Sequence, residues 1–182
     1  MKFGEEQIEL DAIDRQVLAE LQADAQLSYK DLGERVGLAA PSVLERVRKL
    51  EQAGVITGYH AVLDARAVGL DVAAFIGVAI RHPAAVQTVL AWVEGEPQIL
   101  ECHHVTGGYT LLLKAKTRNI RGLDLLIGRI RSIDGVKGTE TMVVLSTHVE
   151  RVNLALDMGR EDESKDSHDA KTPKRARRRA AS

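Results

Sequence analysis

Apolar residues near the start of the chain repeat at helical spacing in two short segments separated by a tight break. Leu32 and Val36 lie four residues apart and share one face of a first helix, which Gly37 is suited to end. A second helix starts near Pro41, because proline costs little in the first turn of a helix. Its apolar positions, at i, i+4 and i+7, are Val43, Val47 and Leu50. The pattern over residues 29–48 predicts a helix-turn-helix.

A longer helix is predicted over residues 10–26, where Asp11 can cap its start. It would cover the two short helices and complete a three-helix unit. Residues 55–63 mix β-branched and aromatic side chains directly after the second short helix, which predicts a strand. A strand in that position makes residues 10–63 a winged helix-turn-helix domain. The polar residues 64–71 are the expected hinge.

From residue 72 the pattern changes to strands that alternate with helices. The predicted strands are 72–80, 98–105, 109–115 and 139–149, and the predicted helices are 83–93 and 119–133. The order β-α-β-β-α-β is ferredoxin-like, so the whole chain is expected to be of the α+β class. Two helices cover one face of such a sheet, yet the first strand is apolar on both faces. We expect a second copy of the chain to cover the other face, as a two-fold dimer.

Residues 159–182 lack apolar periodicity and form the expected disordered, charged C-terminal tail. They carry an acidic block, Glu161-Asp162-Glu163, and then a basic one over residues 174–179. The basic block can neutralise DNA phosphates or can be a solvated charge run, and the sequence leaves both interpretations open.

Composition narrows the class of protein. With 182 residues, 45% hydrophobic and 28% charged, the chain resembles a soluble globular protein of one or two domains. One cysteine, no signal peptide and no apolar run of membrane-spanning length indicate a cytoplasmic protein. Residues 1–60 hold seven basic and eleven acidic side chains, a net charge of −4, so DNA contact must depend on local basic clusters.

The polar face of the second short helix carries the candidate DNA-reading residues. With the apolar positions inward, the outward residues are Ser42, Glu45, Arg46 and Lys49. Arg46 can bind guanine O6 and N7 with its forked guanidinium, and Glu45 can accept from cytosine N4. Ser42 can contact a base or a phosphate, whereas Arg48 and Lys49 are expected on phosphates.

Tyr29 and Lys30, on the first helix of the pair, are further candidates for contact with the DNA backbone, although solvated surface is the commoner role of such residues. Cys102, His103 and His104 do not predict a metal or catalytic site, because neighbouring side chains of a strand point to opposite faces. No enzyme activity, metal or cofactor is therefore expected.

Three stretches together resemble a known family. They are ELQADAQLS, LERVRKLEQAGVITGY and ECHHVTGGYTLLLK, and they occur in the order found in the Lrp/AsnC (feast/famine) regulators of bacteria and archaea. The resemblance covers residues 10–152. It implies a winged helix-turn-helix joined by a hinge to a RAM-type domain, residues 72–152, that binds small effectors, often amino acids, and forms dimers and often octamers.

The chain departs from the family pattern at two places. Ala39 and Ala40 stand where a serine usually opens the recognition helix, so a side-chain cap worth about 1 kcal/mol is missing. The turn that lines the effector pocket of the family usually carries acids where this chain has Gly108 and Thr110. The candidate effector residues are Thr106, Gly107, Gly108, Tyr109 and Thr110. Backbone N–H groups there can hold a carboxylate, but the missing acids put the usual amino-acid effector in question, and a plain glycine turn is equally consistent.

The sequence therefore predicts a DNA-binding transcriptional regulator, nucleoid-associated in the cytoplasm, whose assembly as a homodimer or octamer responds to a small effector. The partners expected are double-stranded DNA, an effector and further copies of the chain, with no membrane. The alternative is an architectural, nucleoid-like protein that binds DNA with little sequence preference. A small-molecule-binding module or enzyme ranks last, because the sequence shows no paired acid and base and no phosphate loop.

Overall fold

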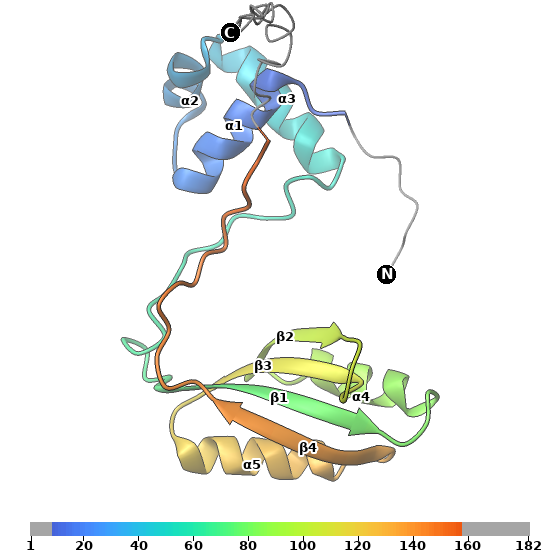
Figure 1. Cartoon of the computed structure of the whole chain (residues 1–182). Coiled ribbons are helices and arrows are strands. Elements are labelled where there is room, and N and C mark those ends of the chain that lie inside the picture. The colour runs from blue at the N-terminus through green and yellow to red at the C-terminus, as the bar shows by residue number, and fades with distance from the viewer. Residues whose placement is uncertain (1–8, 158–182) are drawn as a thin grey trace, which may run out of the picture. The chain divides into compact units, whose positions relative to one another are not determined.

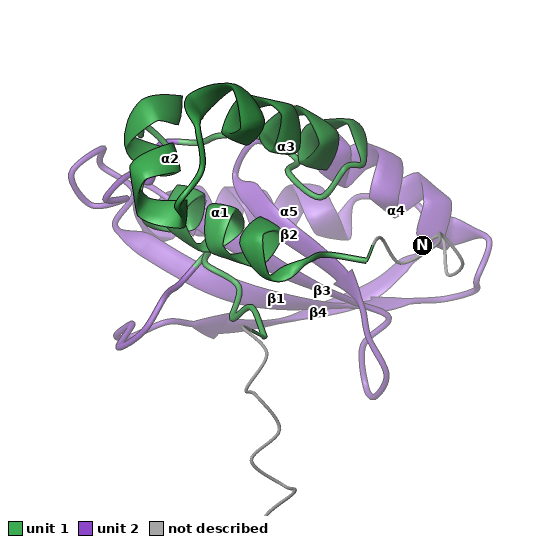
Figure 2. Ribbon diagram, turned by 90° about the horizontal axis from the view of Figure 1, so that it is seen from above, with its two compact units in different colours: residues 1–60, 152–182 green, residues 61–151 purple. Residues whose placement is uncertain are grey.

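The computed structural model describes residues 9–157, and the predicted tail, 159–182, lies outside the described residues. The described chain divides into two compact units, coloured separately in Figure 2. Of the described residues, one unit holds 9–60 together with 152–157, and the other holds Ala61–Arg151. The chain therefore passes between the units twice.

The first unit contains three helices, α1 (Ala12–Ala23), α2 (Tyr29–Val36) and α3 (Ala40–Gln52), as the apolar spacing predicts. Side-chain hydrogen bonds cap the starts of α1 and α2. Asp11 accepts from the Asp14 N–H at 2.7 Å, and the Asp14 side chain accepts from the Asp11 N–H at 3.2 Å, which closes a capping box. Ser28 caps α2 through the Asp31 N–H, and α3 has no side-chain cap at Ala39.

One apolar cluster holds the three helices together. Gly37 ends α2 with a left-handed φ of +73°, as predicted, and so turns the chain sharply between the two short helices. The completely or nearly completely buried members of the cluster are Val17, Leu18, Leu32, Val36, Val43, Val47 and Leu50. Leu156, more than a hundred residues later in the chain, packs against the same cluster.

The strand predicted over residues 55–63 is wrong, since no strand is formed there. The Val55 and Ile56 N–H groups instead donate to the Leu50 carbonyl at 2.9 and 3.2 Å, which closes the end of α3. A strand needs a neighbour to pair with, and every strand of the described chain lies in the second unit. The expected hinge, 64–71, contains a turn in which the Leu70 N–H donates to the Ala65 carbonyl at 2.8 Å.

The second unit is the predicted β-α-β-β-α-β fold. Its elements are β1 (Val72–Ile80), α4 (Ala85–Glu94), β2 (Ile99–His104), β3 (Leu111–Thr117), α5 (Ile120–Arg131) and β4 (Val136–Val143). The sheet order is β2-β3-β1-β4, with every pair antiparallel (Figure 1). Asn119 caps α5 by accepting from the Gly122 N–H at 2.9 Å.

The last strand was predicted over 139–149, and that range is wrong at both ends. β4 begins earlier, because the turn at Gly135, with φ +86°, places Val136 opposite Ile80. It ends at Val143 because β1, its partner, begins at Val72, and the Val144 N–H makes one more bond to the Ala73 carbonyl.

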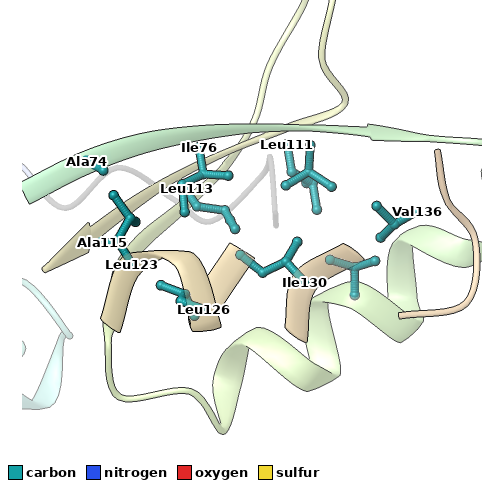
Figure 3. Close-up of a cluster of buried hydrophobic side chains, with 11 residues drawn as sticks. Ala74, Ile76, Leu111, Leu113, Ala115, Leu123, Leu126, Ile130 and Val136 are labelled. Atoms are coloured by element: carbon teal, nitrogen blue, oxygen red, sulfur yellow. The ribbon is translucent and has the colours of Figure 1, made fainter. Parts of the chain in front are cut away.

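Both helices pack on one face of the sheet, as the core residues in Figure 3 show. Ala74, Ile76 and Val78 of β1 point to that side and are buried with side chains of β3, α4 and α5. On the opposite face Phe75 is 37% and Met142 45% exposed. This second face therefore has exposed apolar side chains at Phe75 and Met142.

Candidate nucleic-acid interface

The exposed face of α3 gathers four of the predicted DNA-reading residues. Ser42, Glu45, Arg48 and Lys49 are exposed, while the apolar positions between them are buried in the core of the unit. Within residues 9–157, Arg48 and Lys49 have no ion-pair partner. The face therefore offers two unpaired cations, a carboxylate and a hydroxyl, which are groups that phosphates and base edges bind.

Arg46 has a different environment from the other four. Its Nη1 donates to Asp11 Oδ2 and to Asp14 Oδ1, both at 2.7 Å, so that it joins α3 to the start of α1. The two carboxylates raise the pKa of Arg46, with Asp11 the larger cause. The pKa of Asp11 is lowered, first by the hydrogen bond from the Asp14 backbone and then by Arg46. That Arg46 reads a base stays a prediction. In the structure Arg46 also joins α3 to the start of α1.

Sequence reasoning missed the contact between Arg46 and α1. Asp14 is more than thirty residues away from Arg46 in the chain, and its carboxyl side chain is only 10% exposed. The signal available in the sequence was the pair Asp11 and Asp14, three residues apart at the start of a helix, which is the spacing of a capping box. A charged residue buried at a capping box needs a partner, and that need points to a cation on a neighbouring helix.

The two candidates on α2 lie at the surface. Tyr29 is 41% exposed, and the Lys30 side chain is 80% exposed with its Nζ 4.0 Å from Glu34 Oε1. After α3, the Tyr59 hydroxyl donates to Glu51 Oε1 at 3.0 Å. Burial, and then this carboxylate, raise the pKa of Tyr59 to about 12, which keeps the hydroxyl a donor.

The predicted effector turn joins β2 to β3. Thr106, Gly107 and Gly108 are exposed, and Gly107 has a φ of +118°, a region that favours glycine. The Tyr109 ring lies directly on Gly77 of β1, so close that a Cβ atom added to Gly77 would lie only 2.6 Å from the ring. The carboxylate of Glu140 raises the pKa of the Tyr109 hydroxyl.

Glu140, on β4, is a residue that sequence reasoning missed near the turn. It lies opposite Gly77, the glycine beneath Tyr109, and therefore on the same sheet face as Tyr109. Its carboxylate is exposed and is the first cause of the raised pKa of Tyr109. The turn thus has an acid beside it, although Gly108 and Thr110 carry none.

A charged network lies at the other end of the same sheet face. Lys114 bridges Glu101 and Glu150 at 2.8 and 2.6 Å, and Lys116 lies 3.2 Å from Glu150. These ion pairs lower the pKa of Glu101, with Lys114 the first cause and His103 the second, and Lys114 is also the first cause of the lowered pKa of Glu150. A cavity of about 390 Å³ opens here, and the two lysines and Glu150 line it.

The cysteine and histidines of β2 lie as expected for a strand. Burial raises the pKa of the Cys102 thiol, and Cys102 packs against the core, whereas His103 Nε2 lies 3.2 Å from Glu101 Oε2 at the surface. In the described range, residues 9–157, no cluster of three His, Cys, Asp or Glu side chains could hold a metal ion. In the same range no helix is both long and apolar enough to cross a membrane.

Two family models match the chain, one for each unit. Residues 10–51 match the AsnC-type helix-turn-helix domain, and residues 73–154 match the Lrp/AsnC ligand binding domain. The chain belongs to the Lrp/AsnC family. As an Lrp/AsnC protein it is a DNA-binding transcriptional regulator with a ligand-binding domain, and its family is one of regulators rather than of enzymes.

Relatives in the Lrp/AsnC family share both units. The HTH-type transcriptional regulator FL11 of Pyrococcus horikoshii is 35% identical over 149 residues, which cover 82% of this chain and 98% of FL11. The leucine-responsive regulatory protein of Rhizobium meliloti is 39% identical over 141 residues, covering 76% of this chain and 90% of the relative. Because nearly all of each relative is matched, the two-domain organisation is common to all three.

Solved Lrp/AsnC structures agree with this fold. Escherichia coli AsnC is 32% identical with a TM-score of 0.75, over 80% of this chain and 98% of AsnC. A transcriptional regulator of Neisseria meningitidis, solved as a complex with L-Met, is 31% identical with a TM-score of 0.78, over 82% of this chain and 98% of that one. The fold predicted from the sequence, helix-turn-helix followed by a ferredoxin-like domain, is thereby confirmed.

Proposed function

We propose that this regulator reads operator DNA with the exposed face of α3, where Ser42 and Glu45 contact bases and Arg48 and Lys49 contact phosphates. The observation that carries the proposal is the pair of exposed cations on α3 without ion-pair partners among residues 9–157. Two copies related by a two-fold axis would read half-sites about one helical turn, roughly 34 Å, apart or a multiple of it.

Fluorescence anisotropy with operator and unrelated DNA tests these roles. Arg48→Ala should weaken binding to all sequences to a similar degree and lower the dependence on salt, because phosphate contacts carry no sequence information. Glu45→Ala should mainly change the preference at one base pair of the half-site. Arg81→Ala, at an exposed position of the second unit, is the matched arginine control and should bind DNA like the wild type. If Arg48→Ala bound like the wild type, the assignment of this face would be wrong.

We propose further that two copies associate through the sheet face opposite the helices. Phe75 and Met142 are large apolar side chains that are exposed side by side on that face. A face of this kind in a two-layer domain is a surface for a partner, and the self-complementary partner is a second copy. Association of dimers into octamers, as the family resemblance implies, would follow from further contacts.

The effector of this chain is proposed to be a free amino acid or a related metabolite. The transcriptional regulator of Neisseria meningitidis, which shares this fold, was solved as a complex with the amino acid L-Met, and this supports the proposal. In this chain the backbone N–H groups of Gly107 and Gly108 would hold the carboxylate. Glu140 would take the ammonium group, in place of the acids absent from the turn.

A thermal-shift screen of the twenty amino acids, followed by calorimetry on each hit, tests this site. Glu140→Gln should weaken binding of the hit at least tenfold, because it removes the charge that pairs with the ammonium group. Glu94→Gln, at an exposed position of α4, is the matched control and should bind like the wild type. If an amino acid bound equally tightly to Glu140→Gln and to Glu94→Gln, the effector site would lie away from Glu140.

The proposal places the protein on the chromosome in the cytoplasm, where a DNA-binding regulator acts. The alternative is an architectural protein that binds DNA with little sequence preference. Comparing the affinities for promoter DNA and for unrelated DNA distinguishes the two functions. A regulator should bind its own promoter at least 10³-fold more tightly than unrelated DNA at physiological salt. A similar affinity for all sequences, with a steep dependence on salt, would favour the architectural alternative.

A further inference from the structure

A cavity of about 390 Å³ opens beside the start of β1, where β3 ends and the chain leaves β4. Residues 144–150, which follow β4, run past the start of β1 (Figure 1), and they line the cavity together with residues of β1 and β3. Phe75 and Val149 make part of the lining apolar, and Ser146 and Thr147 add hydroxyl groups. A cavity of this size and mixed lining suits a small metabolite.

Two lysines of β3 supply the positive charge of this cavity. Lys114 and Lys116 lie two residues apart on one strand, so their side chains are on the same face of the sheet. The side chains are largely buried, with exposed fractions of 21% and 18%. Because a largely buried cation needs an anion beside it, the two ammonium groups form a site that a carboxylate can occupy.

Glu150 is the carboxylate that bridges the two lysines in this structure. Its Oε1 lies 2.6 Å from Lys114 Nζ, and its Oε2 lies 3.2 Å from Lys116 Nζ. Glu150 belongs to a segment that is neither helix nor strand, and among the described residues no backbone hydrogen bond holds residues 145–150. Since the Glu150 side chain is partly exposed and such ion pairs add little net stability, a free carboxylate can compete with it.

The charges around the cavity match a single carboxylate. Glu101 also pairs with Lys114, at 2.8 Å, but it does not line the cavity. When Glu150 is displaced, two cations and one anion remain, Lys114, Lys116 and Glu101, with a net charge of +1. One carboxylate balances that charge. An ammonium group one carbon away from the carboxylate, as in an amino acid, would lie close to both lysines and be repelled.

We propose that this cavity is a second ligand site, which binds a small carboxylic acid with an apolar chain and no ammonium group, such as a 2-oxo acid. The carboxylate of the ligand bridges Lys114 and Lys116 in competition with Glu150, and its chain lies against Phe75 and Val149. The site is separate from the turn between β2 and β3, and it does not depend on the roles proposed for α3 or for that turn.

The chain connects Glu150 with the DNA-binding unit. Asn153, three residues later, donates from Nδ2 to the Gln22 carbonyl of α1 at 2.9 Å. The Gln22 carboxamide bonds both backbone groups of Leu154, accepting from its N–H at 2.6 Å and donating to its carbonyl at 3.2 Å. A ligand that displaces Glu150 therefore frees the residues that lead to this docked segment, and its binding is expected to change the affinity for DNA.

Calorimetry on the full chain tests the site with three probes that share one carbon skeleton. The probes are 3-methyl-2-oxobutanoate, L-valine, which has an ammonium group in place of the oxo group, and 3-methyl-2-butanone, which has a methyl group in place of the carboxylate. The 2-oxo acid should bind saturably and the ketone should not. Any binding of L-valine should be the same in the wild type and in Lys116→Gln. Equal dependence of both acids on Lys116 would contradict the proposed ligand class.

Two variants of the cavity should change the affinity for the 2-oxo acid in opposite directions. Glu150→Gln should bind it at least fivefold more tightly, because the apparent affinity of the wild type is reduced by the fraction of molecules in which Glu150 fills the site. Lys116→Gln should bind it at least tenfold more weakly, because one of two charged partners is lost. Lys137→Gln, at an exposed position of β4 outside the lining, is the matched control and should bind like the wild type.

Three outcomes would overturn the site. The first is no saturable binding of the 2-oxo acid to the wild type and to Glu150→Gln at millimolar concentrations. The second is weaker binding to Glu150→Gln, which would make Glu150 a contact of the ligand rather than its competitor. The third is loss of binding in Glu140→Gln but not in Lys116→Gln, which would place the ligand at the turn.

Fluorescence anisotropy with operator DNA tests the connection to the DNA-binding unit. Saturating 3-methyl-2-oxobutanoate and the substitution Glu150→Gln should each change the operator affinity of the full chain at least twofold and in the same direction, because both release Glu150 from the lysines. The 2-oxo acid should then add little to the effect of Glu150→Gln. Opposite effects, or an operator affinity that neither change alters, would overturn the connection.

Discussion

Arg46 is the residue on which the geometry of the DNA-binding unit depends most directly, because one guanidinium nitrogen bonds two carboxylates at the start of α1. We expect Arg46→Ala to lower the free energy of unfolding by about 1–3 kcal/mol, since it leaves the nearly buried Asp14 carboxylate without its cation. Urea denaturation of the full chain measures this loss.

Arg48→Ala is the matched control for that measurement. Arg48 is exposed two residues further along the same helix, so its removal should change stability by less than about 0.5 kcal/mol while weakening DNA binding. The two variants thus separate stability from DNA contact. Equal stabilities of Arg46→Ala and Arg48→Ala would contradict the structural role of Arg46.

Asp11 gives the unit a dependence on pH whose sign follows from its lowered pKa. The Asp14 backbone N–H, and then Arg46, hold the pKa of this carboxyl below its ordinary value of 3.8. The ionised Asp11 carboxylate therefore stabilises the folded chain. This stabilisation is complete above the pKa of Asp11 in the unfolded chain and is lost as pH falls through its pKa in the folded chain. Asp11→Asn, which can still cap α1, should therefore be less stable than the wild type at neutral pH, and the difference should vanish in acid. Thermal unfolding from pH 7 to pH 2 checks this, and a gap that widened in acid would refute it.

Among the three helices of the DNA-binding unit, α3 is the one whose start carries no side-chain cap. Ala39 has φ −71° and ψ 145°, the extended geometry that a capping serine adopts. Ala39→Ser should therefore stabilise the chain by about 1 kcal/mol, because the hydroxyl can accept from the first turn of the helix. The melting temperature measures the gain. Ala40→Ser, one residue later and inside the helix, is the control, and an equal gain there would argue against capping.

The helices and strands that could be predicted from sequence are those whose ends are set by residues within or next to them. β1 was placed at both ends, since nine consecutive small or apolar residues lie between polar ones, and the ends of α2 followed from Ser28 and Gly37. Residues 55–63 have strand-forming side chains but pair with no strand, and pairing cannot be seen in a local pattern.

The same limit applies to the candidate site. The outward face of α3 follows from helical spacing, and four of its predicted residues are exposed. The partners of Arg46, and the place of Glu140 beside Tyr109, depend on contacts between residues about thirty positions apart. Only the packing of α1 on α3, and of β4 beside β1, brings these groups together.

At the scale of the whole molecule, the open sheet face sets the expected assembly. Phe75→Glu places a charge at the centre of that face, and burial of a charge in an interface is costly without a partner. We expect the variant to be monomeric at concentrations where the wild type is dimeric, by light scattering. Leu125→Glu, at a residue of α5 that is 57% exposed on the helical side, is the control. A dimeric Phe75→Glu chain would place the interface elsewhere.

The double passage of the chain between its units also has a consequence for synthesis. The core of the DNA-binding unit includes Leu156, which the ribosome delivers only after all of β1 to β4. Because domains fold as they emerge, the ligand-binding domain can be complete while the helical unit still lacks part of its core. A fragment that stops at His60 would therefore lack a side chain that packs against the core of the helical unit.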